Sequence, residues 1–198
     1  GDQGDLFTVH GDLDIIDKDG EPLDESSLKA GALIRVEYDL ILDSYPGQVA
    51  PRTVQVMGEG DDMVGLYSAM LDEIWNMDKG LNPGEGELLA IDVEEVANLT
   101  GGEKDALVWL AGSRFKVYSM ASTFEKLEEE GYIDGVLLQF KDENGMLIKI
   151  STSDVKEGSF KFRISKWVSG VGADWCDDCT ASKKDGVWSF EFGGFAVS

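Results

Sequence analysis

The sequence predicts a small N-terminal all-β unit followed by an α+β domain, in which helices pack on a mainly antiparallel sheet. Three observations lead to this prediction. Up to Gly58 the chain carries β-branched and apolar runs with a period of two. Helical periodicity begins after Gly60, and the last third returns to strand-like runs. Helices that precede strands, without sustained strand-helix alternation, indicate α+β and argue against a doubly wound nucleotide fold.

Two domains are therefore expected, a small β-barrel-like domain over residues 1–58 and an α+β domain over residues 61–198. The first offers three strand-like runs separated by turn residues. Pro46 and Gly47 in "SYPGQ" fit positions i+1 and i+2 of a type II turn. An oligonucleotide/oligosaccharide-binding (OB) barrel usually has five strands, so the N-terminal domain is expected to be only partly OB-like.

Three helices are expected between the two β-rich parts. Asp61 or Asp62 can cap the first helix, whose apolar residues recur at three- and four-residue spacing. Thr100-Gly-Gly-Glu103 fits a capping box before the second helix, and Ser122-Thr-Phe-Glu125 repeats the device before the third. The run "ELLAIDV" between the first two helices indicates a short buried strand.

The last third of the sequence predicts a meander of strands. Asn144-Gly145 lies between "GVLLQF" and "MLIKIS" and is a strong short-range signal for a hairpin. The later runs "SFKFRISKW", "CTASK", "VWSFEF" and "GFAVS" are also typical of strands.

The charge balance excludes some classes of partner. Seventeen basic against thirty-nine acidic side chains give a net charge of −22, which disfavours nucleic acid and anionic membrane surfaces. No apolar run approaches the roughly 20 residues of a membrane span, and no signal peptide is present. Because "GDQGD" lacks Met, we expect a trimmed chain, for which a missing export signal does not indicate a cytoplasmic protein.

Two stretches resemble proteins of Gram-positive bacteria. The stretch from Leu28 to Val56, with its strand before "SYPGQ", resembles a small barrel domain of unknown function in uncharacterised lipoproteins. The C-terminal run from Lys166 to Ser198, with "KWVSGVGA" and "DGVW", is similar to the tail of uncharacterised secreted proteins of clostridial relatives. The resemblance implies an exported cell-surface protein with a lipid anchor upstream of residue 1, and it brings no known activity or catalytic residue.

The spacing Cys176-x-x-Cys179 has several interpretations. A redox centre would place the first cysteine at a helix N-terminus, whereas this pair follows a Gly-rich turn and has Asp177 and Asp178 between its members. A zinc site needs about four ligands, and the chain has two cysteines and one histidine. A local disulfide in an oxidising compartment is the main expectation. A regular strand would instead separate the two thiols on opposite faces.

No catalytic, metal or cofactor site is predicted. His10 lies in a strand-like run, and no Gly-x-Ser-x-Gly nucleophile motif is present. Ser113-Arg-Phe-Lys116 matches Ser-x-x-Lys, but it has none of the companion motifs of that class. The sequence "DKDG" lacks the first and last ligands of a calcium loop and indicates a hairpin turn.

The best candidate binding surface combines the "SYPGQ" corner with "KWVSGVGADW". Large aromatic side chains bracket a glycine-rich turn, where the backbone can approach a ligand closely. The alternative is that both tryptophans fill the core and the lysine pairs with an acid. The candidate binding residues are Tyr45, Lys166, Trp167, Ser169 and Trp175.

Three functions remain open from the sequence. The first is a non-catalytic envelope module that binds a protein, peptide or glycan, because aromatic residues cluster near turns and no catalytic set is present. The second is a hydrolase-like enzyme whose site is not linear in sequence. The third is an inhibitor or interaction subunit of a larger envelope assembly, which a large apolar patch or a stable dimer would favour.

Overall fold

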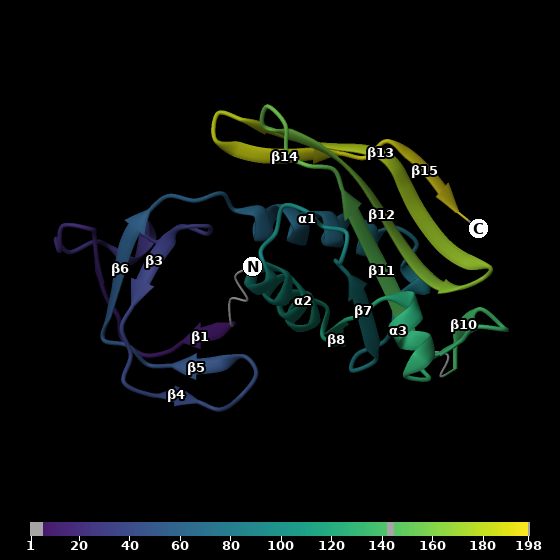
Figure 1. Cartoon of the computed structure of the whole chain (residues 1–198), viewed down its shortest axis with the longest axis horizontal. Coiled ribbons are helices and arrows are strands. Elements are labelled where there is room, and N and C mark those ends of the chain that lie inside the picture. Colours follow the sequence, from purple (N-terminus) through teal and green to yellow (C-terminus); the bar gives the residue numbers. More distant parts are fainter. Residues whose placement is uncertain (1–5, 142–144, 198) are drawn as a thin grey trace.

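Six short strands form two small sheets at the N-terminal end of the chain (Figure 1). The structure is a computed structural model and describes residues 6–141 and 145–197. The sheets have the orders β1-β5-β4 and β2-β6-β3, and each contains one parallel pair. The strands are β1 (Phe7–Val9), β2 (Asp14–Ile16), β3 (Leu33–Val36), β4 (Ile41–Leu42), β5 (Gly47–Val49) and β6 (Thr53–Gly58). The sequence suggested three strands here, because two-residue and three-residue strands leave little periodicity to detect.

A nine-stranded sheet forms most of the remaining chain. Its main path has the order β14-β13-β12-β11-β7-β8, while β9, β10 and β15 pair at its sides. The strands β11, β7 and β8 are mutually parallel, and the pairs from β11 to β14 are antiparallel. The strands are β7 (Leu88–Asp92), β8 (Tyr118–Ala121), β9 (Ile133–Asp134), β10 (Gln139–Phe140), β11 (Gly145–Thr152), β12 (Ser159–Ser169), β13 (Gly172–Lys184), β14 (Val187–Glu191) and β15 (Gly194–Val197).

Three α-helices lie against both faces of the parallel strands. The helices α1 (Met63–Asn76) and α2 (Gly101–Phe115) share one core cluster with Leu89 and Ile91 of β7. The helix α3 (Phe124–Glu129) contributes Leu127 to a second cluster with Ala90. Because successive residues of a strand point to opposite faces, the two clusters lie on opposite sides of β7.

The expected α+β class, with helices packed on a mainly antiparallel sheet, is wrong. Over the described residues the protein is mostly β, with 41% strand and 22% helix, three small helices and a sheet curled into a half-barrel. The long strands β12 and β13 explain the difference, since their register shifts twice along the pair and bulges bend a sheet. The curled sheet supplies much of its own core, including Phe160, Phe162 and Phe190. These strands could be expected individually, but the curl could not.

The helix starts follow the sequence closely. The Asp62 side chain caps α1 by accepting from the Gly65 amide, and Thr100 with Glu103 forms the expected capping box of α2. In the third helix the cap is Thr123, one residue later than expected, and it accepts from the Lys126 amide at 3.3 Å.

Two of the turns expected from the sequence differ from those in the structure. The Tyr45–Pro46 peptide is cis and Gly47 lies in β5 without a positive φ, so the "SYPGQ" corner is not a type II turn. The segment "GVLL" forms a turn, and β10 pairs with β9 and β12. Asn144 of the expected hairpin lies outside the described residues.

The two-domain division stays a prediction. Within the described residues, the strands up to Gly58 pair only with one another, and α1 begins at Met63. The backbones of Gly31 and Gly60 approach so closely that a Cβ on Gly60 would lie 2.3 Å from the Gly31 carbonyl oxygen. Glycine is therefore required where the N-terminal strands meet the start of α1.

Candidate functional site

A hollow of about 680 Å³ opens where β7 and β8 end. Asp92 is the last residue of β7, and Ser122 directly follows β8. The first turn of α2 and the side chain of Lys126 on α3 form the other walls. Because α2 and α3 lie on opposite faces of parallel strands, this is the kind of edge at which open α/β sheets bind ligands. We call this hollow the polar pocket.

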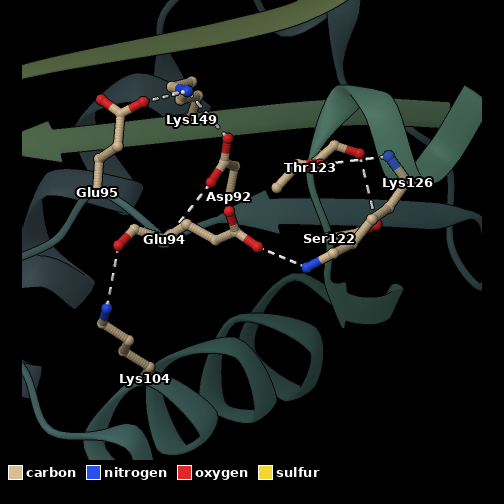
Figure 2. Close-up of polar contacts among 8 residues, drawn as sticks. All are labelled: Asp92, Glu94, Glu95, Lys104, Ser122, Thr123, Lys126 and Lys149. Carbon is tan, nitrogen blue, oxygen red and sulfur yellow. Dashed lines mark hydrogen bonds and ion pairs between the residues drawn. The ribbon is translucent and has the colours of Figure 1, made fainter.

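Asp92 anchors the floor of the polar pocket (Figure 2). The residue is only 3% exposed, and its Oδ1 accepts from the Glu94 amide at 3.1 Å. Its Oδ2 lies 3.2 Å from Nζ of Lys149, which also contacts Glu95 at 2.9 Å. These hydrogen bonds, led by the one to Glu95, raise the pKa of Lys149. The ammonium group therefore stays charged and fixes both carboxylates.

Glu94 contacts lysines of both α2 and α3 at the mouth of the polar pocket (Figure 2). Nζ of Lys126 lies 2.5 Å from its Oε1, and Nζ of Lys104 donates to its carbonyl oxygen at 3.4 Å. The hydrogen bond and the charge of Glu94 raise the pKa of Lys126. Both lysines are thus engaged with Glu94, whereas Asp105, which also lines the pocket, forms no ion pair within the described residues.

A second hollow, also of about 680 Å³, follows the open edge of β8. All four residues of β8 line it, together with one side of α2 that includes the half-buried Trp109. Tyr45 reaches it from the N-terminal strands, and burial, followed by the charge of Asp105, raises the pKa of this tyrosine. The polar pocket and this second hollow share Asp105 and Ala121 as lining residues. We call the second hollow the edge groove.

The arrangement favours binding of a polar ligand. The acids and lysines of the polar pocket can exchange their internal ion pairs for contacts with a ligand. Within the described residues, no group of three or more histidine, cysteine, aspartate or glutamate side chains could hold a metal ion. His10 lies on the exposed N-terminal part and contacts Thr8 at 3.0 Å.

The structure does not gather the predicted binding residues in one place. Tyr45 lies at the edge groove, 71% exposed. Trp167 packs against Phe124 and Phe140 in the second core cluster. Trp175 in β13 and Ser169 at the end of β12 are half-buried, and Lys166 is fully buried. Of the five, Tyr45 is therefore the residue that reaches either hollow.

Lys166 is fully buried and turned inward. Its ammonium donates to the carbonyl oxygens of Met77 and Asp78 and to Oδ1 of Asn82, and it lies 3.7 Å from Oδ2 of Asp174. Burial lowers the pKa of Lys166 and raises that of Asp174, while the charge of each partner opposes these shifts. Lys166 thus fixes the segment around the short helix η2 (Lys79–Leu81) onto the sheet.

Cys176 and Cys179 are free, buried thiols in β13. Asp178 adopts a positive φ of 55°, and the pairing with β12 shifts between Phe162 and Ile164. This bulge turns both thiols into the same core, although a regular strand would place positions i and i+3 on opposite faces. The disulfide expected for an exported chain stays a prediction.

We expect the reduced thiols to react slowly in the folded protein. Burial raises the pKa of Cys176 to about 11, so little nucleophilic thiolate is present at pH 8. Ellman's reagent should modify both cysteines quickly only in denaturant, which absorbance would record. Fast labelling of the native protein would contradict this. Mass spectrometry of exported protein, with and without reductant, would detect the disulfide directly.

Asp92 offers a test of how the polar pocket is built. Asp92→Ala should lower the free energy of unfolding by about 1–3 kcal/mol, because the Glu94 amide loses its acceptor and Lys149 loses a buried counter-ion. Asp92→Asn retains a carbonyl oxygen for that amide and should cost less. Urea denaturation of both variants measures the difference, and equal losses would argue against the role of the amide contact.

Sequence reasoning did not identify the residues of the polar pocket. The available signal is that "ELLAIDVEE" and "VYSMAST" each end an apolar run in acidic or hydroxyl side chains. That signal becomes informative only when the two strands are known to be parallel neighbours, because then both ends meet at one edge of the sheet.

Comparison with known proteins identifies no similar protein. No family model, curated protein or solved structure matches the chain. The function of the site is therefore inferred from its geometry, and the resemblance to Gram-positive envelope proteins stays an expectation. In the part of the chain that the structure describes, no helix is long and apolar enough to cross a membrane.

Proposed function

We propose that the protein is a non-catalytic binding module of the Gram-positive cell envelope, exported to the cell surface. In this proposal it binds a protein, peptide or glycan partner through the polar pocket and the adjoining edge groove. The observation that carries it is the pair of adjoining hollows at the ends and open edge of the parallel strands. The buried Asp92 gives this site a fixed polar group, and the exposed Lys126 can exchange its ion pair with Glu94 for a contact with a ligand.

A ligand screen tests the proposal. Defined peptides, peptidoglycan fragments and oligosaccharides are added to the full chain, and the melting temperature is recorded for each. We expect at least one class to raise it, since a ligand that binds only the folded state stabilises that state. Lys126→Ala should raise the Kd of that ligand about tenfold, the loss expected when one charged hydrogen bond is removed, and the rise in melting temperature should be correspondingly smaller. Lys161→Ala, an exposed lysine on β12, is the matched control.

The same experiment separates binding from catalysis. Mass spectrometry of each bound ligand after incubation should recover it unchanged. A new product whose formation is lost in Asp92→Asn would favour the hydrolase-like alternative. If no member of any class binds, the polar pocket is not the site of a binding module.

A further inference from the structure

The strand β8 has one unpaired edge, and that edge faces the edge groove. On its paired side the Tyr118 amide donates to the Glu87 carbonyl at 2.8 Å, and the Ser122 amide donates to the Ile91 carbonyl at 3.3 Å. Because backbone groups of a strand alternate between its two sides, the N–H and C=O groups of Ser119 and Ala121 point away from β7. Within the described residues, no strand pairs with this side of β8.

The groove beside this edge is long enough for an added strand of about five residues, and it has a charged side chain near each end. It runs between β8 and α2, with the half-buried Trp109 along its wall. Asp105 lies near the end of β8 and Lys116 near its start, and neither forms an ion pair within the described residues. Their separation along the helix is about 16 Å at 1.5 Å per residue. An extended peptide covers the same distance in about five residues.

We propose that an extended peptide segment binds along β8 as an additional strand, with a basic residue at Asp105 and an acidic group at Lys116. Its backbone pairs with Ser119 and Ala121, and its side chains contact Trp109. The net charge of −22 also attracts peptides with basic residues as they approach the protein. This inference rests on the proposed function, because it names the ligand class of the same site.

Synthetic hexapeptides test the proposal on the full chain. The probes are fluorescein-labelled Lys-Val-Thr-Val-Thr-Glu and its reversed sequence, which cover both strand directions. We expect one of them to bind, as measured by fluorescence anisotropy. The same peptide with alternate backbone amides N-methylated, in the two possible phases, retains its side chains but cannot donate those hydrogen bonds. One phase should bind about tenfold more weakly, the loss expected from one or two backbone hydrogen bonds. Equal binding by all forms would overturn strand addition.

Matched variants locate the bound peptide. Ala121→Pro removes an N–H that β7 does not use, and Trp109→Ala removes the aromatic wall, so each should weaken binding about tenfold. Leu110→Ala, a neighbouring α2 residue outside the groove, should leave binding unchanged. Circular dichroism and the melting temperature check that each variant is folded. Peptide affinity that is unaffected by Ala121→Pro and by Trp109→Ala would contradict this location.

The two proposals fail in different ways. If neither hexapeptide binds, but a ligand from the screen binds and is weakened by Lys126→Ala, strand addition is wrong and the binding function stands. If the peptide and every screened ligand fail, both proposals are wrong. Binding of a peptide with two terminal lysines as tightly as the Lys–Glu probe would contradict the role of Lys116, and equally tight binding of a peptide with two terminal glutamates would contradict the role of Asp105.

Discussion

Lys166→Ala is expected to lower the free energy of unfolding by about 3–5 kcal/mol, the usual result when one partner of a buried ion pair is removed. The substitution leaves Asp174, itself 1% exposed, as an uncompensated buried charge. It also removes the donor to three oxygens of residues 77–82. That segment should then separate locally from the sheet, and urea denaturation with hydrogen exchange would measure both effects.

Two controls make the Lys166 result interpretable. Lys161→Ala removes an exposed lysine from the same strand and should change stability by less than about 0.5 kcal/mol. The double variant Lys166→Met with Asp174→Leu removes both charges and should recover a large part of the loss, since buried pairs can often be replaced by apolar residues. If Lys166→Ala behaves like Lys161→Ala, the buried cluster is not important for stability.

Leu127→Ala should cost about 2–5 kcal/mol, because it creates a cavity at a fully buried position. Leu127 is the buried residue of α3 and packs in the cluster that covers the second face of β7. The adjacent residue is Lys126, whose contact with Glu94 borders the polar pocket. The variant should therefore also weaken any ligand that depends on Lys126.

Chemical denaturation and ligand binding together test the Leu127 prediction. Leu110→Ala is a suitable control, because that leucine is 41% exposed on α2 and its truncation leaves no internal cavity. A loss of stability no greater than that of Leu110→Ala would show that α3 does not close a core. Loss of stability with unchanged ligand affinity would separate α3 packing from the site.

Local features were predictable, whereas the shape of the sheet was not. The capping residues Asp62 and Thr100 identify the starts of α1 and α2, because caps depend on contacts within three residues. The curl of the large sheet depends on bulges in β12 and β13, which no periodicity reveals. Parallel pairing of β7 with β8 and β11 likewise depends on contacts between distant segments.

The candidate site was predictable in one residue only. The sequence predicts Tyr45 as a binding residue because it is an aromatic residue at a corner, and its side chain lines the edge groove. The sequence predicts Lys166 as a binding residue because it is a cation in an acidic chain, but its burial depends on oxygen acceptors that lie more than 80 positions earlier. The sequence does not indicate Asp92 or Lys126, because isolated acids and lysines carry no signal until the fold brings them together.

The bulge at Asp178 also limits how much a disulfide between Cys176 and Cys179 would contribute to stability. Both sulfurs belong to one strand, so a bond between them would close a ring of four residues and would join no separate parts of the fold. On chain-entropy grounds so short a ring is worth about 2 kcal/mol, against about 4.7 kcal/mol for a ring of 100 residues. Reduction of the disulfide would therefore free only this bend of β13. The other strands and helices would be unaffected, because the disulfide does not cross-link them.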